Sequence, residues 1–105
     1  MQKDIDIVLY GATGFTGQLC VKYFQSLGLE INWAIAGRNP DKLQDVANRL
    51  AINVEILTAD SNNEEGLRKI CSRSKVVLST AGPFHRYGSK LVAACVENGT
   101  DYVDI

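Results

Sequence analysis

The chain has 105 residues, of which 46% are hydrophobic and 22% are charged, and its formal net charge is −1. This length allows one domain with a core of its own, and the composition excludes a disordered chain. The charge balance excludes a basic nucleic-acid-binding surface, no apolar run is long enough for a transmembrane segment, and the charged N-terminus is not a signal peptide.

A strand over residues 5–10 and a helix over 15–27 are predicted first, joined by a glycine-rich turn. The turn consists of Gly11, Ala12, Thr13, Gly14, Phe15, Thr16 and Gly17. Strand, glycine turn and helix in this order bind the pyrophosphate of a dinucleotide, because glycine lets the backbone approach the phosphates and the helix N–H groups favour an anion. The G-x-x-G-x-x-G spacing alone is a weak signal, and a tight turn without a ligand is the alternative.

A second strand over residues 31–37 and a helix over 40–51 follow, with Asn39 as the expected cap of that helix. An NAD-binding site usually has an acidic residue at the tip of this strand, where it bonds the ribose hydroxyls. Here the strand is followed by Arg38, whose guanidinium suits the 2′-phosphate of NADP. NADP is therefore the favoured cofactor. NAD is the alternative, because Asp41 could still reach a ribose hydroxyl.

The third strand, predicted over residues 53–58, is followed by Asp60 and by a helix over 63–73. The carboxylate of Asp60 has two equally weighted interpretations. It could accept a hydrogen bond from the adenine amino group of the cofactor, or it could cap the helix, for which Ser61 is the other candidate.

The fourth strand, predicted over residues 75–80, leads into three small or rigid residues, Ala81, Gly82 and Pro83. They follow the carboxyl edge of the predicted sheet, which is where ligands bind in this architecture. We expect this segment to pass close to the ribose and nicotinamide of the cofactor. A simple Gly-Pro turn is the alternative.

A helix over residues 88–98 and a strand over 101–105 complete the pattern. Strands and helices alternate throughout, which predicts the α/β class with a Rossmann-type parallel sheet and helices on both faces. The first and fourth strands are mostly apolar, whereas the third and fifth alternate with polar residues, which favours the strand order 3-2-1-4-5. Apolar residues of the fifth strand would lie at an open sheet edge, so we expect a homodimer or poor solubility.

The sequence identifies no catalytic residue. His85 is the only histidine, and without an identifiable partner it is interpreted as a solvent-facing loop residue. Tyr87 and Lys90 are three residues apart rather than four and begin the fourth helix, so we reject them as a proton-sharing catalytic pair.

Three cysteines, Cys20, Cys71 and Cys95, lie far apart in the sequence and form no metal-binding spacing, so no metal is expected. An odd number of cysteines without a signal peptide indicates reduced thiols and a cytoplasmic location. Cys20 and Cys95 are expected to be small buried apolar side chains.

Motifs along nearly the whole chain resemble one family. They are the glycine turn at 11–17, Ala36-Gly37-Arg38, Ala81-Gly82-Pro83-Phe84 with Tyr87-Gly88, Leu91-Val92 with Ala94-Cys95, and the segment 99–104. This set is similar to the N-terminal NAD(P)-binding domain of saccharopine dehydrogenase-like oxidoreductases, which include the trans-acting enoyl reductases. The resemblance implies a cofactor cleft formed by residues 11–17, Arg38 and residues 81–87. It also implies a second, substrate-binding domain after the fifth strand.

Residues 1–105 are accordingly interpreted as the NAD(P)-binding domain of a longer protein. The expected function is that of an oxidoreductase module, which positions NADP(H) for hydride transfer to a small-molecule substrate held by a missing second domain. The alternatives are a non-catalytic NADP-binding redox sensor or regulatory module, and an interaction module that uses the fold alone.

Overall fold

The computed structural model describes residues 3–60, 62–80 and 89–104, which form four helices and five strands. The strands are β1 (Ile5–Tyr10), β2 (Trp33–Gly37), β3 (Glu55–Thr58), β4 (Ser74–Ser79) and β5 (Asp101–Asp104). The helices are α1 (Phe15–Leu27), α2 (Pro40–Arg49), α3 (Glu64–Arg73) and α4 (Ser89–Glu97). All strand pairs are parallel and the order is β3-β2-β1-β4-β5, which confirms the predicted Rossmann-type topology.

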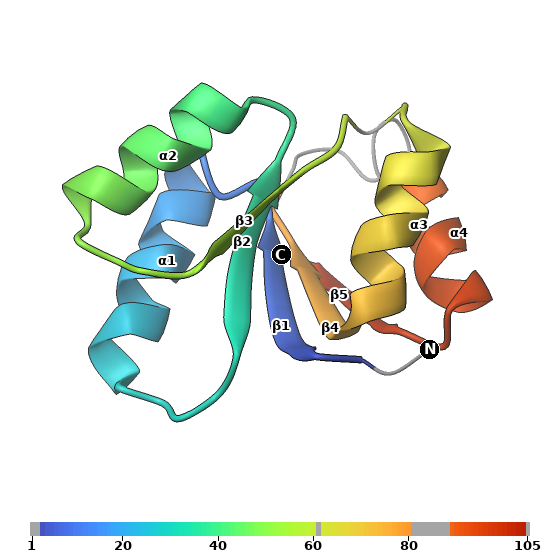
Figure 1. Cartoon of the computed structure of the whole chain (residues 1–105), viewed down its shortest axis with the longest axis horizontal. Coiled ribbons are helices and arrows are strands. Elements are labelled where there is room, and N and C mark those ends of the chain that lie inside the picture. Colours follow the sequence, from blue (N-terminus) through green and yellow to red (C-terminus); the bar gives the residue numbers. More distant parts are fainter. Residues whose placement is uncertain (1–2, 61, 81–88, 105) are drawn as a thin grey trace.

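The helices form a layer on each face of the sheet. α1 and α2 lie on one face, and α3 and α4 lie on the other (Figure 1). On the first face Leu9 of β1 packs with Ile35 of β2 and with Leu43 of α2, all three buried. On the second face Val8 and Val77 pack under Leu67 of α3. Two apolar layers therefore hold the sheet, as is required of parallel strands that are covered on both sides.

Burial differs between the central and the edge strands as the sequence pattern predicts. Four of the six residues of β1 are buried and none is exposed, whereas β3 and β5 each contain exposed residues. The reason is positional, because an edge strand has a neighbour on one side only and is incompletely covered by helices.

Helix ends agree with the expectations at two points and differ at a third. Asn39 caps α2, its side-chain oxygen accepting from the N–H groups of residues 41 and 42, and Gly28 ends α1 in the left-handed conformation. The expectation that Asp60 or Ser61 caps the third helix is wrong for Asp60, and Ser61 lies outside the described residues. Asn63 is the cap, accepting from the N–H of Gly66 at 3.0 Å. The cap therefore lies directly before Glu64.

The cysteines are free thiols in this structure. Cys95 is fully buried, as expected. Cys20 is only half-buried, because it belongs to α1 and lies at the margin of the core. Cys71 is also fully buried, and its Sγ lies 3.5 Å from the Sγ of Cys95. That contact, together with burial, raises the pKa of the Cys71 thiol, so it stays protonated.

None of the described helices is long and apolar enough to cross a bilayer. The described residues also contain no group of three or more histidine, cysteine or acidic side chains that could hold a metal ion.

Candidate functional site

The glycine turn connects the carboxyl end of β1 to α1, in the middle of the sheet (Figure 1). Gly11 has a φ of 89°, in the region that side chains disfavour, so glycine is needed there for the turn itself. Its N–H donates to the carbonyl of Ala36 in β2 at 2.8 Å. Its carbonyl accepts from the hydroxyl of Thr80, directly after β4, at 3.2 Å. Both strands next to β1 therefore fix the turn.

Gly17 is required for a different reason, which is close packing of α1 on the turn. A Cβ at this position would collide with the carbonyl oxygen of Gly11 and would lie 2.8 Å from Cα of Ala12. Both are backbone atoms and cannot rotate away. The helix can therefore start this close to the strand only with glycine here, as the sequence pattern predicts.

Gly14 differs from these two glycines, because nothing within the described fold requires it. Its φ of −75° and ψ of 171° are open to any residue. A Cβ built there would have one neighbour within 4 Å, the carbonyl oxygen of Gly11, at an ordinary 3.6 Å. A methyl group would fit the folded chain, but it would occupy space beside the start of α1. Glycine at this position leaves the backbone at the start of α1 without a side chain beside it.

The start of α1 has unused hydrogen-bond donors. Gly14 is the N-cap and has no side chain to accept from them, and no acidic residue lies in the first turn. Within the described part of the chain, the N–H groups of residues 15–17 have no acceptor. By contrast α2 and α3 are capped by Asn39 and Asn63 and carry acidic residues in their first turns. The positive end of α1 is thus left for an anion.

Arg38 follows β2 at the same edge of the sheet and is exposed. The other three described arginines, Arg49, Arg68 and Arg73, each contact at least one carboxylate. Arg38 has no ion pair with any described residue. Its guanidinium is therefore free to bind an external anion such as a phosphate.

Tyr10 is the last residue of β1, directly before the glycine turn, and it was not singled out from the sequence. Its hydroxyl donates to the carbonyl of Ala59 at 2.8 Å, which ties β1 to the loop after β3. Burial raises the pKa of Tyr10 to about 12, and the negative charge of Asp60 adds to the shift while Arg38 opposes it. The charges of Arg38 and Asp60 therefore both act on Tyr10 at the carboxyl end of β1.

Asp60 shapes the loop before α3 rather than capping that helix. One carboxylate oxygen accepts from the N–H of Asn62 at 2.9 Å, and the Asp60 carbonyl accepts from the N–H of Asn63, also at 2.9 Å. This arrangement is an Asx turn. The second interpretation, an acceptor for the adenine amino group, stays a prediction.

Residues 7–105 match the model of the saccharopine dehydrogenase NADP-binding domain. The chain belongs to this family. A trans-acting enoyl reductase of Mycobacterium ulcerans is 40% identical over 107 residues, and the match covers 99% of this chain and 26% of that relative. This NADP-binding domain therefore spans about a quarter of the length of that relative.

Solved structures with low identity share the fold of this NADP-binding domain. An apo saccharopine dehydrogenase from Saccharomyces cerevisiae superposes with a TM-score of 0.77 at 23% identity, over 95% of this chain and 21% of that chain. A quinone oxidoreductase from Escherichia coli in complex with NADPH gives a TM-score of 0.75 at 20% identity, over 92% of this chain and 35% of that chain. These likenesses show that the sheet order and helix layers are those of Rossmann-like enzymes.

Several predicted residues lie outside the described part of the NADP-binding domain: Ala81, Gly82, Pro83, His85 and Tyr87. Their roles stay predictions. Two residues that the sequence reasoning missed are Tyr10 and Thr80, which hold the glycine turn and the strand ends in place. The signal that could have found them is their position, since each is the polar residue at or directly after the end of a buried strand.

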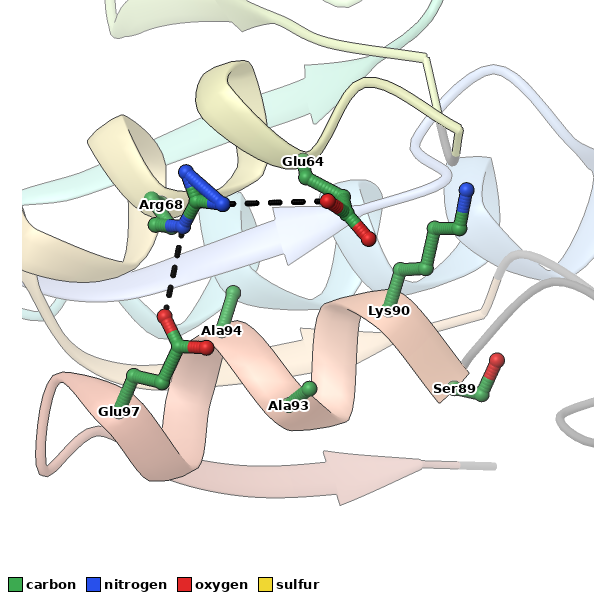
Figure 2. Close-up of a pocket in the computed structure, with 7 residues that line it drawn as sticks. All are labelled: Glu64, Arg68, Ser89, Lys90, Ala93, Ala94 and Glu97. Carbon is green, nitrogen blue, oxygen red and sulfur yellow. Dashed lines mark ion pairs between the residues drawn. The ribbon is translucent and has the colours of Figure 1, made fainter.

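Lys90 lines a shallow hollow between α3 and α4 that does not fit a ligand site (Figure 2). Arg68 lies across the hollow and contacts Glu64 at 3.8 Å and Glu97 at 3.4 Å, so its charge is already compensated. All three side chains are about half exposed. The hollow is therefore lined by a solvated ion-pair network on the surface of the two helices.

Proposed function

We propose that this NADP-binding domain holds the pyrophosphate of NADP(H) on the first turn of α1 and its 2′-phosphate on Arg38. The supporting observation combines three features of the described residues. The N–H groups of residues 15–17 have no acceptor among them, the fold does not require glycine at position 14, and Arg38 has no acidic partner among them. Each feature leaves an anion-binding group unused by the fold itself. Their position at the carboxyl edge of a parallel sheet is where dinucleotides bind in this architecture.

The presence of Asp41 is not evidence that the cofactor is NAD. It lies in the first turn of α2, whose positive end favours a carboxylate whether or not a ribose is bound. A guanidinium at the preceding strand end supplies the bidentate donors that a 2′-phosphate accepts. The choice between the two cofactors therefore depends on Arg38.

We further propose that the domain serves an oxidoreductase with additional chain beyond these residues. The relative from Mycobacterium ulcerans is about four times as long as the matched region, so three quarters of it lies outside the part that resembles this chain. NADP(H) would supply the hydride, and a second domain would hold the substrate. The name of that relative favours an enoyl group as the acceptor. Within that longer protein, the residues of the present chain bind the cofactor and fix its orientation.

The free thiols favour the cytoplasm as the compartment. Cys71 and Cys95 lie with their sulfur atoms 3.5 Å apart and are not bonded, and a reducing compartment keeps such pairs as thiols.

The role of Arg38 is tested by titrating NADPH and NADH into the wild-type chain and the variant Arg38→Ala. A lost charge-assisted contact of about 1.5–3 kcal/mol predicts that NADPH binding weakens roughly 10- to 100-fold, while NADH binding changes little. Arg68→Ala is the matched control, because it removes the same charge from α3 in the opposite helix layer, where Arg68 contacts Glu64 and Glu97. If Arg38→Ala retains the NADPH preference of the wild type, the assignment is wrong.

A further inference from the structure

The side chain of Gln18 contacts the backbone of the glycine turn. Gln18 belongs to α1 and directly follows Gly17, and its Nε2 donates to the carbonyl of Thr13 at 2.8 Å. In a regular helix, that carbonyl would accept from the N–H four residues later, on Gly17. No such bond is present between these two described residues, and the amide of Gln18 contacts the carbonyl instead. The side chain therefore binds the turn at the point where the helical pattern stops.

The peptide group between Thr13 and Gly14 is held at both of its polar atoms. Its oxygen accepts from Gln18, and its N–H donates to the carbonyl of Gly11 at 3.2 Å. Because a peptide group is planar, these two bonds fix the orientation of the whole plane. The residue that follows is a glycine, whose own backbone rotations are the least restricted of any residue. The bond from residue 18 back to residue 13 also spans the N–H groups of residues 15–17.

Arg49 of α2 decides which way round the Gln18 amide lies. Its Nη2 donates to the Oε1 of Gln18 at 3.1 Å, and its Nε donates to the carboxylate of Asp45 at 3.0 Å. A guanidinium can only donate, so the amide presents its oxygen to Arg49 and its NH₂ group to Thr13. The reverse orientation would oppose two donors at one end and two acceptors at the other. Glutamine meets both demands, whereas a carboxylate or a thioether of similar length could not donate.

Gln25 provides an internal comparison on the same helix. Its Nε2 donates to the carbonyl of Leu50 at 2.8 Å, at the end of α2. The two glutamines are about two helical turns apart and both reach towards α2. Gln25 joins two helix ends that are remote from the glycine turn, whereas Gln18 joins α1 and α2 to the turn itself. Their substitutions can therefore separate an effect on the turn from an effect on the helix.

We propose that Gln18 is a positioning residue, which holds the glycine turn so that the N–H groups of residues 15–17 keep the orientation in which they bind the pyrophosphate. This inference rests on the proposed NADP site. Gln18 acts through the carbonyl of Thr13 and does not itself contact the cofactor. Because its bonds lie within the protein, the turn is pre-organised and less ordering is needed on binding. Loss of these bonds should weaken cofactor binding although no group that contacts the cofactor is removed.

The first test is Gln18→Met, which removes both hydrogen bonds and keeps the length and helix propensity of the side chain. Calorimetric titration should show a dissociation constant for NADP⁺ that is raised about five- to tenfold, the equivalent of about one neutral hydrogen bond. Gln25→Met is the matched control, because it removes the same donor from the same helix, and it should bind NADP⁺ like the wild type. Without cofactor, amide exchange at Gly14 should be faster in Gln18→Met only. Thermal unfolding verifies that both variants are folded.

The second test, Gln18→Glu, gives a pH signature that a general loss of stability would not produce. Its carboxylate can accept from Arg49 but cannot donate to Thr13, so NADP⁺ should bind weakly at neutral pH. Protonation turns one oxygen into a donor, so binding relative to the wild type should recover as the pH falls through the ordinary glutamate pKa of about 4.3. Gln18→Met cannot be protonated and should stay weak. Since it is neutral, it also separates the lost donor from repulsion by an added charge.

The outcomes distinguish the role of Gln18 from the NADP site on which it depends. If the wild type and Gln18→Met bind NADP⁺ equally well, the role of Gln18 alone is refuted. Equal weakening in Gln18→Met and Gln25→Met also overturns it, because the effect would then be general to α1. A folded Gln18→Glu variant that stays weak on acidification contradicts the donor role. A wild-type chain that binds no NADP⁺ refutes the proposed site, and the role of Gln18 with it.

Discussion

The substitution of Gly14 by alanine separates the stability of the fold from its ability to bind a cofactor. The added Cβ would lie 3.6 Å from its one neighbour within 4 Å, and the backbone at this position has a φ of −75°. Alanine is a poorer N-cap than glycine, while it also reduces the entropy of the unfolded chain. These effects have opposite signs and are each about 0.5–1 kcal/mol, so we expect the free energy of unfolding to change by less than about 0.5 kcal/mol.

Cofactor binding is expected to respond strongly to the same methyl group. The N–H groups of residues 15–17 have no acceptor among the described residues, and the methyl would be added at the N-cap directly before them. Loss of one charge-assisted hydrogen bond to a phosphate costs about 1.5–3 kcal/mol, so the dissociation constant for NADPH should rise at least about tenfold. Fluorescence titration with NADPH measures this change, and thermal unfolding followed by circular dichroism measures stability.

Gly17→Ala serves as the contrasting variant. Its Cβ would collide with backbone atoms of Gly11 and Ala12, so we expect a loss of at least about 2 kcal/mol of stability whether or not cofactor is present. The reasoning is refuted if folded Gly14→Ala binds NADPH as tightly as the wild type, because then no ligand approaches that backbone. It is also refuted if Gly17→Ala is as stable as the wild type, because the helix would then not depend on close packing.

Two further predictions concern stability. Asn63→Ala should lower the free energy of unfolding by about 1 kcal/mol, because it removes the side-chain acceptor for the N–H of Gly66 at the start of α3, and chemical denaturation checks this. Spectrophotometric titration should show one tyrosine ionising near pH 12, and Tyr10→Phe should remove that step. Since the pKa of Tyr10 is higher in the folded chain, its contribution to stability is complete below about pH 10 and is lost as the pH rises through about 12. The stability of Tyr10→Phe should therefore depend less on pH in that interval, and an unchanged alkaline profile would contradict the assignment.

Much of the architecture could be predicted from local patterns in the sequence. The bounds of β1 and α1 agree with the predictions at both ends, because an apolar run, a glycine turn and an amphipathic helix with Gly28 at its end are signals contained within short segments. Agreement was poorer at the end of α2, which stops at Arg49 rather than at residue 51. Ala51 has a φ of 53°, a left-handed conformation that its side chain does not signal.

The candidate site could be predicted in part for the same reason. Gly11, Gly17 and Arg38 are recognisable because each belongs to a motif with a fixed position relative to a strand end. Tyr10 and Thr80 were missed because their partners, Ala59 and Gly11, are 49 and 69 residues away in the sequence. A polar residue at a strand end marks each of them as a candidate, but no local pattern indicates which distant residue it contacts.

The sequence by itself determined the order of strands and helices, the glycine turn and the family, since these depend on periodicity and on residue types at short spacing. Only the tertiary structure decided which glycine is dispensable to the described fold and which arginine has no acidic partner among the described residues. Both properties depend on the contacts that a group makes in the folded chain, and not only on the contacts that its residue type allows. They arise only when segments distant in the chain come together, which is why burial and pairing, rather than composition, indicate where a ligand can bind.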